Sequence, residues 1–459
     1  MRYLSTRGLA PPLGFDDVLL TGLAPDGGLY VPETWPEFAE SEIAAMRGLS
    51  YPLLVAAISA PFVDGSATDL IGIAEDAYAP FERLVPLTEL GDGLWLLELY
   101  WGPTLAFKDY ALQLLGRMFD ASLAARNTRA LLLGATSGDT GSAAIEACRD
   151  RSRLDIVVLH PHGRVSDVQR RQMTTVAAAN VHNVAVQGTF DDCQRLVKAM
   201  LADPALRRDL GVTSVNSINW VRIMAQVAYY FAAALAMGAP EQEVSFAVPT
   251  GNFGNVFAAY VARRMGLPIR RLIIGTNRNN AVVRFFETGR LSIDKVVPTI
   301  TPAMDIQVPS NLERLLFDMH DQDGEAVRHM MGRFAEQGQV EIGAANLRNV
   351  QDFVKGSWFD ESAIRHSLAD VFGKRALLVD PHTAVGIAAA RATEREEDIP
   401  VICVGTAHPA KFPDAVEAAT GVRPPLPGRL ADLLNRKETM TILPPDLVEI
   451  EAFVRSVTG

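Results

Sequence analysis

The sequence predicts an α/β protein whose sheets are open and mostly parallel, with helices packed on their faces. From about residue 129, short apolar runs alternate with segments of helical pattern, as in RALLLGA before GSAAIEACR and VSFAVPT before NVFAAYVARRMG. Such alternation is typical of βαβ units. Several of these runs end in glycine-rich turns. Because ligands bind beyond the carboxyl ends of parallel strands, we expect these turns to meet at one cleft.

Length, composition and charge indicate a globular protein of two or three domains. The chain has 459 residues, of which 48% are hydrophobic and 21% charged. The formal net charge of -11 argues against nucleic acid or an anionic membrane as the main partner, because both require a basic surface. A local basic pocket for a small anion is compatible with this charge.

Cysteine usage and hydropathy favour a cytoplasmic protein without a metal. Cys148, Cys193 and Cys403 are few, widely separated and free of any C-x-x-C pattern, which indicates reduced thiols. No apolar signal core follows the amino-terminal MRYLSTRG. The longest apolar stretch, IMAQVAYYFAAALAMG, is too short to span a bilayer, and we expect it to be a buried helix.

The first eighty or so residues look like a separate unit. GLAPDGGLYVP is rich in turn residues and precedes a short β-type run. SEIAAMRGLS predicts a short helix with Ser41 as its N-cap. A connector then leads into a strand hairpin with Gly91, Asp92 and Gly93 at its turn.

The remaining elements follow the same alternation. Further strands are predicted at RLDIVVLHP, NVHNVAVQG, IRRLIIGTN, RALLVD and IPVICVGT. Helices are predicted at VSDVQRRQMTTV, FDDCQRLVKAML and TAVGIAAARA. The stretch from DIQVPSNLERLLFD to IRHSLAD is mostly helical and charged, and we interpret it as an insertion. A proline-rich turn and a short amphipathic helix end the chain.

The segment PTGNFGN has the features of an anion-binding loop. Gly251 to Asn255 lie after a predicted strand and before a helix. Small residues there let backbone N–H groups approach a phosphate, and the helix N-terminus adds partial positive charge. The alternative is a plain strand-to-helix turn that uses glycine for its conformational freedom. The segment matches neither a Walker loop nor the G-x-G-x-x-G pattern.

A second loop, GATSGDTGSAA, has the same context but is rich in hydroxyl groups. It can bind a carboxylate or phosphate through side-chain and backbone donors. The alternative is an ordinary capped helix with Asp139 or Thr140 as N-cap. Two such loops in one α/β chain indicate a ligand with two anionic ends, or a cofactor together with a substrate.

Lys108, in GPTLAFKD, is the third unusual feature. Most lysines lie on solvated surfaces, but this one begins a helical pattern beside Phe107. An amine in an apolar pocket loses part of its proton affinity and can act as a nucleophile or base. An amine that meets a phosphate-bearing aldehyde is the arrangement that pyridoxal 5′-phosphate requires.

Together these motifs resemble the threonine synthase family. GPTLAFKD, GATSGDTGSAA, PTGNFGN and GTAHPAKF occur in this order, and YLSTRG and GLAPDGGLYVPE are similar to the family's own N-terminal domain. NSINWVRI, GTNRNN and MDIQVPSNLERLLF also match, so the resemblance covers essentially the whole chain. The N-terminal signature separates the chain from tryptophan synthase β, cysteine synthase and threonine dehydratase.

The resemblance implies fold type II of the pyridoxal-phosphate enzymes. This is a tryptophan synthase β-like α/β fold with two open, twisted, mostly parallel sheets, flanking helices and a small N-terminal domain. We therefore expect an N-terminal domain over residues 1–80 and a catalytic region over 81–459. Within that region we expect a large domain at about 81–125 and 240–459, a smaller inserted domain at about 126–239, and a helical insertion at about 303–370.

The resemblance also implies roles for individual residues. Lys108 forms the internal aldimine with pyridoxal 5′-phosphate, and Thr406 hydrogen-bonds the pyridine nitrogen. Asp139 stands near the cofactor's phenolic oxygen, where related enzymes often carry asparagine, and a carboxylate there requires a proton or a nearby cation. The substrate is faced by Ser137, Gly138 and Thr140. The cofactor phosphate is bound by Gly251, Asn252, Phe253, Gly254 and Asn255.

The implied reaction is β,γ-replacement, converting O-phospho-L-homoserine and water to L-threonine and phosphate, the last step of threonine biosynthesis. This is carbon–oxygen lyase chemistry acting on a phosphate ester. The substrate amine displaces Lys108, which then moves protons at Cα and Cβ. Water adds at Cβ after the γ-phosphate has left, and the departing phosphate is a candidate acid and base for that step.

The substrate brings its own phosphate, so a second anion site is needed. The candidates are Lys411, Arg314, Asn311 and Arg222, and each can instead be a structural ion-pair or capping residue. One departure from the family is visible, since FHGPTLAFKD is common where this chain has Trp101 before Gly102. The change removes any hydrogen bond from a histidine there but leaves the lysine.

Three other functions compete with this one. A threonine-synthase-like phospho-lyase would release phosphate but yield 2-oxobutyrate, and the motifs alone do not exclude it. A non-catalytic binding protein is disfavoured because it has no need of Lys108. A nicotinamide-dependent dehydrogenase lacks its G-x-G-x-x-G fingerprint here. The expected partner is a small-molecule substrate, and the expected state a monomer or homodimer.

Overall fold

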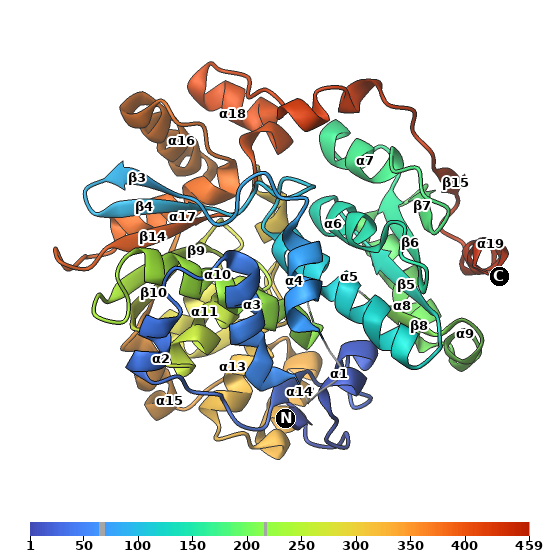
Figure 1. Cartoon of the computed structure of the whole chain (residues 1–459), viewed down its shortest axis with the longest axis horizontal. Coiled ribbons are helices and arrows are strands. Elements are labelled where there is room, and N and C mark those ends of the chain that lie inside the picture. Colours follow the sequence, from blue (N-terminus) through green and yellow to red (C-terminus); the bar gives the residue numbers. More distant parts are fainter. Residues whose placement is uncertain (64–68, 215–217, 459) are drawn as a thin grey trace.

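Two sheets lying side by side organise this computed structural model, which describes residues 1–63, 69–214 and 218–458 (Figure 1). The larger sheet has the order β13 (Val354–Trp358), β10 (Ile269–Thr276), β9 (Val244–Pro249), β14 (Val401–Gly405), β4 (Leu94–Glu98) and β3 (Leu87–Gly91). The smaller has the order β15 (Thr441–Leu443), β7 (Val181–Val186), β6 (Leu154–Pro161), β5 (Ala130–Ala135) and β8 (Val212–Ser214). Every pairing in them is parallel except that of β3 with β4.

These sheets confirm the predicted α/β fold with two mostly parallel sheets. The predicted hairpin is also present, because β3 and β4 pair in antiparallel fashion on either side of Asp92. Asp92 and its two glycine neighbours all have positive φ angles, which glycine adopts without strain.

The larger sheet is covered on both faces, so its strands are apolar on both. Phe246 and Val248 of β9 pack in the same core as helices α10 (Trp220–Ala236) and α11 (Gly254–Arg264). Ala247, between them, points to the opposite face, toward α16 (Glu361–Arg375) and α17 (Pro381–Ala392). This alternation follows from the two-residue period of a strand. The expected buried helix is α10, since most of its side chains are buried.

The smaller sheet follows the same rule. Leu132 of β5 packs with α5 (Lys108–Ala125) and α6 (Asp139–Cys148), whereas Leu131 and Leu133 pack with α8 (Phe190–Ala202). Two further helices complete this part of the chain: α7 (Asp167–Thr174) and α9 (Pro204–Leu210). Helix α5 leaves the larger sheet and contacts α6 and α10, so Lys108 at its start lies at the junction of the two sheets.

The amino-terminal part forms a small unit, in which α1 and α2 lie below α10 and α4 lies beside it in Figure 1. Its elements are β1 (Tyr3–Ser5), α1 (Phe15–Thr21), β2 (Tyr30–Pro32), α2 (Glu40–Ala45), α3 (Tyr51–Ser59) and α4 (Leu70–Tyr78). Helix α2 is where predicted, but Ser41 is not its N-cap. The helix begins at Glu40 after Ala39, and the Glu42 carboxylate accepts a hydrogen bond from the Ala39 backbone nitrogen at 2.7 Å. That carboxylate satisfies the free N–H in place of a serine hydroxyl.

The predicted helical insertion contains strands as well as helices. Its elements are α13 (Leu312–Met319), α14 (Gly324–Gln337), β12 (Gln339–Glu341), α15 (Ala344–Gln351), β13 and the start of α16. Strand β13 extends the larger sheet beside β10, and β12 pairs with β11 (Arg290–Ser292), which follows α12 (Ala281–Thr288). The sequence pattern missed β13 because an edge strand carries too few apolar residues to be distinctive.

A predicted strand at RALLVD is absent from the structure. Helix α16 runs on to Arg375, and residues 376–380 connect it to α17 without regular secondary structure. Because α16 and α17 pack against each other, this connection follows the helices and joins no sheet.

The carboxyl-terminal residues return to the smaller sheet. After α18 (Pro413–Thr420) the chain crosses the molecule, β15 pairs with β7, and α19 (Leu447–Val457) packs against α8 (Figure 1). The expected amphipathic last helix is therefore present. The expected large domain extended to residue 459, but β15 belongs to the sheet of the expected smaller domain. Strand pairing over so long a separation has no local sequence signal.

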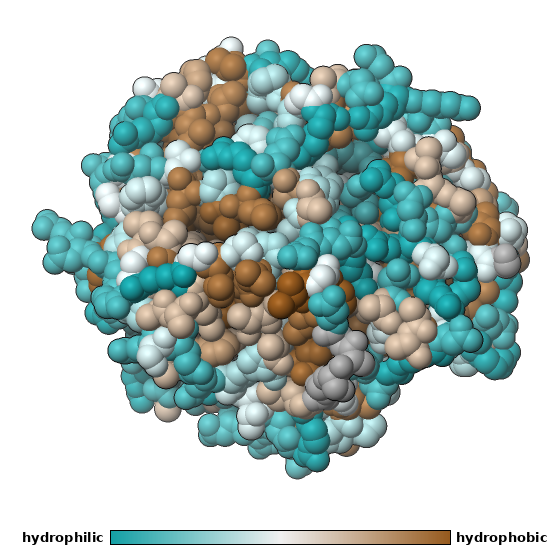
Figure 2. Space-filling view, viewed as in Figure 1, coloured by the Kyte–Doolittle hydropathy of each residue, from teal (hydrophilic) through white to brown (hydrophobic). Residues whose placement is uncertain are grey.

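The visible surface is mostly hydrophilic, with hydrophobic patches mainly over the half that carries the larger sheet (Figure 2). Among the described residues, no helix is both long and apolar enough to cross a membrane.

Candidate active site

Lys108 is held at the junction of the sheets by the turn before it. Leu105 has a positive φ angle, and its backbone nitrogen hydrogen-bonds to Gly102. The next residues join the loop after β14, because the Phe107 nitrogen donates to the Thr406 carbonyl at 2.9 Å. A Cβ on Gly102 would lie 2.6 Å from the Asp109 carboxylate, so only glycine fits there. The motif GPTLAFKD therefore fixes where Lys108 enters the cleft.

Three predicted motifs converge on one cavity of 2080 Å³. Lys108, the hydroxyl-rich loop and the loop after β9 all line it, together with Thr406. The sequence-predicted residues on its wall are Lys108, Ser137, Asp139, Thr140, Arg222, Gly251, Asn252, Phe253, Gly254, Asn255 and Thr406. This confirms the expectation that glycine turns from separate strands meet at one cleft.

The loop Gly251–Asn255 has the geometry of an anion cradle. Phe253 has a φ angle of 65° and caps α11, which turns the backbone sharply into the helix. A Cβ on Gly251 would lie 2.6 Å from the carbonyl oxygen of Ala303, so the backbone is approached too closely for any side chain. The first residues of α11, Gly254 to Val256, line the cavity at the positive end of the helix.

Asn255 adds a side-chain donor to this loop. Its Oδ1 accepts hydrogen bonds from the Tyr229 hydroxyl at 2.5 Å and the Tyr230 hydroxyl at 2.6 Å. Its Nδ2 is buried and has no hydrogen-bond partner among the residues that the structure describes. Two tyrosines therefore fix the amide so that its N–H₂ group remains for an acceptor such as phosphate.

Thr406, at the end of β14, presents a similar unpaired group. Its backbone nitrogen donates to Thr383 Oγ1 at 3.0 Å, but its own buried Oγ1 has no partner within the described part of the chain. A buried hydroxyl without a partner costs free energy unless a ligand supplies one. A pyridine ring nitrogen is a group of the right kind.

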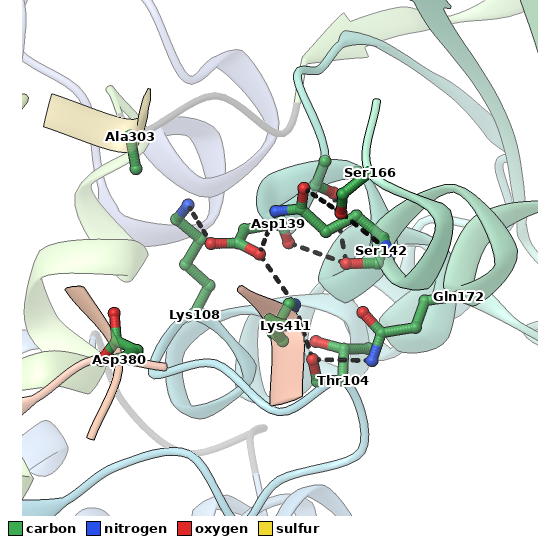
Figure 3. Close-up of polar contacts among 12 residues, drawn as sticks. Thr104, Lys108, Asp139, Ser142, Ser166, Gln172, Ala303, Asp380 and Lys411 are labelled. Atoms are coloured by element: carbon green, nitrogen blue, oxygen red, sulfur yellow. Dashed lines mark hydrogen bonds and ion pairs between the residues drawn. The ribbon is translucent and has the colours of Figure 1, made fainter. Parts of the chain in front are cut away.

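Asp139 lies between two lysine side chains (Figure 3). Its Oδ1 is 2.8 Å from Lys411 Nζ and accepts a second bond, also 2.8 Å, from Gln169 Nε2. Its Oδ2 is 3.6 Å from Lys108 Nζ. Burial alone would raise the pKa of Asp139, but the ammonium groups of Lys411 and Lys108 outweigh it and hold this pKa well below its usual range. The carboxylate is therefore ionised, and the buried Lys411 ammonium lies beside it.

The environment of Lys108 makes its amine less basic than that of an exposed lysine. Burial lowers the pKa of Lys108, Asp139 opposes this effect, and the positive charges of Lys411 and Arg222 add to it. The side chain remains 15% exposed toward the cavity. A less basic and accessible amine is the form that attacks a carbonyl group.

The hydroxyl-rich loop departs from the simple capping alternative. The N-cap of α6 is Gly138, so Asp139 and Thr140 both lie inside the helix. Thr136 Oγ1 accepts hydrogen bonds from the nitrogens of Gly138 and Gly141, at 3.0 and 2.9 Å, and so closes the loop. Ser137 and Thr140 line the cavity, whereas Gly138 does not. Capping by Thr136 leaves both cavity-facing hydroxyl groups for a ligand.

Besides Gly138, three predicted substrate-binding residues lie outside the cavity wall: Lys411, Asn311 and Arg314. Lys411 and Arg314 are completely buried. Arg314 donates hydrogen bonds to the carbonyl oxygens of Tyr30 and Ile218 and to Asn311 Oδ1. Asn311 donates in turn to the carbonyl oxygen of Asn252. These contacts support the Gly251–Asn255 loop.

Arg222 is the predicted candidate that does line the cavity, in the first turn of α10. It is buried, and burial lowers its pKa to about 10, so the guanidinium keeps its charge near neutral pH. The motif NSINWVRI ends with this turn, and its first two residues, 216 and 217, lie outside the described residues. Trp101, the departure from the family pattern, donates from Nε1 to Glu98 Oε2 at 2.7 Å and does not reach the cavity.

Sequence reasoning missed a second set of residues around the cleft. His382 lines the cavity, and its Nδ1 and the Asp380 carboxylate are 2.9 Å apart. Its Nε2 accepts a bond from the Ala303 nitrogen at 3.3 Å, so the proton of the neutral ring lies on Nδ1. Asp380 before Pro381 is a sequence signal for the start of a helix. No local pattern, however, predicts that this helix lies beside Ala303.

The arrangement defines a class of protein. A cavity-lining lysine of lowered basicity, an anion cradle at a helix N-terminus and an unpaired hydroxyl fit the aldehyde, the phosphate and the ring nitrogen of pyridoxal 5′-phosphate. With two mostly parallel sheets around this site, the chain is a pyridoxal-phosphate-dependent enzyme of fold type II. Within the described residues, no group of three histidine, cysteine or acidic side chains is arranged to hold a metal.

Comparisons with known proteins identify the family. The family described as "Pyridoxal-phosphate dependent enzyme" matches residues 76–347, "Threonine synthase N terminus" matches 2–78, and "Threonine synthase, C-terminal" matches 383–454. The chain belongs to the threonine synthase family.

Individual threonine synthases match this chain over almost its whole length. Threonine synthase of Pseudomonas aeruginosa is 50% identical over 99% of this chain and 98% of its own. The crystal structure of pyridoxal-phosphate-bound threonine synthase from Brucella melitensis matches with a TM-score of 0.98 at 48% identity, covering 100% of this chain and 99% of that one. Threonine synthase from yeast matches with a TM-score of 0.95 at 34% identity, covering 99% and 98%.

Proposed function

We propose that this chain converts O-phospho-L-homoserine and water to L-threonine and phosphate, the last step of threonine biosynthesis, as a carbon–oxygen lyase. The observation that carries the proposal is the meeting of Lys108, the Gly251–Asn255 cradle and Thr406 in one cavity of a threonine synthase family member. The cavity is large enough for a cofactor together with a small phosphorylated amino acid.

Each group of residues has a separate task in this proposal. Bound pyridoxal phosphate supplies an electron sink for negative charge beside the α-carbon of an amino acid. The Gly251–Asn255 loop would hold the cofactor phosphate, and the Thr406 hydroxyl would pair with the ring nitrogen. Lys108 would hold the cofactor at rest and afterwards move protons at Cα and Cβ of the substrate. Burial lowers the pKa of Lys108, so its nitrogen gives up a proton more readily than that of an exposed lysine.

For the substrate's own phosphate we propose Arg222, assisted by Ser137 and Thr140. All three line the cavity, and Arg222 carries a positive charge on the wall. A guanidinium forms two parallel hydrogen bonds to phosphate oxygens, which gives orientation as well as charge. Lys411, Arg314 and Asn311 are weaker candidates because they do not line the cavity.

The main test combines a spectrum with a product assay. The purified protein is expected to show the visible absorbance band of a lysine-bound cofactor. Given phosphohomoserine, it should form phosphate and threonine in equal amounts. Lys108→Ala should lose the band and turnover, whereas Lys374→Ala, at a lysine that is 66% exposed, should keep both. Turnover retained by Lys108→Ala would reject the assignment.

The product assay also separates the two rivals. Phosphate with 2-oxobutyrate in place of threonine would make the protein a phospho-lyase. Binding of phosphohomoserine without release of phosphate would make it a binding protein.

The site proposed for the substrate's phosphate is tested by measuring the KM for phosphohomoserine. Arg222→Ala should raise the KM for phosphohomoserine by about tenfold or more, since a charged hydrogen bond is worth about 1.5–3 kcal/mol. An unchanged KM would remove Arg222 from the site.

We also infer that the enzyme is cytoplasmic and acts as a monomer or homodimer. Three free cysteines, all buried, agree with a reducing compartment. Analytical ultracentrifugation of the purified protein distinguishes the two states, and a larger assembly would contradict the inference.

A further inference from the structure

The strongest unexplained feature is a buried lysine pointing at the active-site carboxylate. Lys411 lies in the short helical turn Pro409–Lys411 after β14, and its side chain has no exposed surface. Its ammonium is 2.8 Å from Asp139 Oδ1 and donates to the Thr104 carbonyl oxygen at 2.8 Å. A buried ion pair adds little net stability, because both of its charges are removed from water. This contact therefore needs a reason beyond packing.

The two oxygens of Asp139 face different partners (Figure 3). Oδ1 receives two donors from the protein side, the Lys411 ammonium and the Gln169 amide. Oδ2 faces Lys108 across 3.6 Å, on the cavity side. The carboxylate is thus anchored through one oxygen and presented to the reactive lysine through the other.

The balance of charges around Asp139 explains why Lys411 is needed. While Lys108 is protonated, Asp139 has two cationic neighbours, and when Lys108 is neutral, Lys411 alone balances the carboxylate. Because Lys108 changes its charge and its bonding during any reaction that it performs, it cannot serve as a constant counter-ion. Lys411 can serve as a constant counter-ion, because the protein encloses its side chain completely.

We propose that Lys411 is a positioning residue, a permanent counter-ion that makes the Asp139–Lys411 pair neutral in sum and presents Asp139 Oδ2 to the nitrogen of Lys108. This inference rests on the proposed function, because it takes Lys108 as the reactive amine. It assigns Lys411 a role other than binding the substrate phosphate.

Other charged groups near the pair cannot replace Lys411. Asp109 faces Lys411, is itself acidic, and is held by hydrogen bonds from Thr104 at 2.8 and 2.6 Å. His408 also faces Lys411, and burial lowers its pKa to about 4, so its ring is neutral near pH 7. Arg222 acts on Lys108 from α10 and adds positive charge there. The neutral sum of the pair therefore depends on Lys411.

The proposal predicts opposite effects from two single substitutions and their cancellation in the double variant. Lys411→Met leaves a bare carboxylate beside Lys108, which stabilises the protonated nitrogen and should raise its titration midpoint by about one pH unit or more. Asp139→Asn leaves a bare ammonium and should lower the midpoint. Asp139→Asn combined with Lys411→Met restores neutrality, so its midpoint should return close to that of the wild type.

Two readouts report this midpoint without an activity assay. One is the pH titration of the visible band after the protein has been loaded with pyridoxal phosphate. The other uses the cofactor-free protein, in which the rate of acetylation of Lys108 against pH is followed by mass spectrometry. Lys374→Met is the matched control, since Lys374 is exposed on α16 and pairs only with Asp370 among the described residues.

The outcomes separate the explanations. Opposite shifts that cancel in the double variant support the proposal. Unchanged midpoints in all three variants overturn it and leave Lys411 a structural residue. An increase in KM for phosphohomoserine without a shift also overturns it and makes Lys411 a substrate ligand. If Lys411→Met fails to fold, the comparison of Asp139→Asn with the double variant still decides the matter.

The proposed function can fail separately. If opposite, cancelling shifts are seen in the cofactor-free protein but no threonine is formed, the counter-ion role stands and the assigned reaction does not.

Discussion

Asn311 donates two hydrogen bonds to the carbonyl oxygen of Asn252, from its backbone nitrogen at 3.1 Å and from its side-chain amide at 3.2 Å. Arg314 donates to the other end of that amide, and also to the carbonyl oxygen of Tyr30 in β2. Glu313 beside it accepts bonds from Thr6 and Arg7. Helix α13 thus connects the amino-terminal unit to the loop that we expect to hold the cofactor phosphate.

Replacing Asn311 should therefore loosen the phosphate loop. Asn311→Ala removes one hydrogen bond to Asn252 and one acceptor for the Arg314 guanidinium. We expect pyridoxal-phosphate affinity to fall by about fivefold, as for a loss of about 1 kcal/mol. Titration of the cofactor-free protein with pyridoxal phosphate, followed by absorbance, measures this. Unchanged affinity would show that the backbone bond alone holds the loop.

Gly138 should tolerate no side chain. Its φ angle is 146°, and an added Cβ would lie 2.5 Å from the side chain of Gln169, the residue that holds Asp139. Gly138→Ala should destabilise the protein by about 1–3 kcal/mol and lower kcat, because Gln169 must move. Urea unfolding and steady-state kinetics test both effects.

Gly163→Ala is the control for the backbone contribution. Gly163 has a φ angle of 68°, with nothing within 4 Å of an added Cβ. It should lose about 1–2 kcal/mol of stability and keep its kinetics. Equal kinetics in the two variants would mean that the contact with Gln169 has no functional weight.

Asp305 should organise one side of the cavity. It accepts hydrogen bonds from the Asn277 and Asn279 amides, at 2.8 and 3.0 Å, and from the backbone and hydroxyl of Thr299. Residues 302–305 line the cavity. Asp305→Ala should raise KM severalfold and reduce stability by about 1–3 kcal/mol, because buried donors lose their acceptor. Asp414→Ala, at a side chain that is 89% exposed, should change neither quantity.

The buried Asp109 gives the protein a specific pH dependence. Burial raises its pKa from an ordinary 3.8 to about 6, although hydrogen bonds from Thr104 oppose the rise. The folded state therefore holds an extra proton between roughly pH 4 and 6. The resulting stabilisation is complete below that range and is lost as the pH rises through the folded pKa, by up to about 3 kcal/mol.

Asp109→Asn removes this titration. The free energy of unfolding of the variant, measured relative to the wild type by urea denaturation, should rise by up to about 3 kcal/mol from about pH 4 to 7. A difference that stays constant over this range would contradict the raised pKa.

The sequence alone determined the class of fold and the chemical groups of the site. The alternation of apolar runs and helices predicted parallel sheets because each strand and helix needs only its own local period. Lys108 and the loop Gly251–Asn255 were found because each follows a strand or begins a helix within a short motif, and Thr406 was added by the resemblance to the threonine synthase family. Such motifs fix local backbone geometry, and the carboxyl ends of parallel strands necessarily meet at one edge.

Only the tertiary structure decided how these groups are paired and supported. Lys411 looked like a substrate ligand in HPAKF, but it is completely buried against Asp139, a residue 272 positions earlier in the chain (411 − 139). Arg314 likewise donates to Asn311 and does not line the cavity, and β15 pairs with β7, which is distant in the sequence. Whether a charged side chain meets solvent, ligand or counter-ion depends on packing between remote elements, and no local pattern of residues encodes that distance.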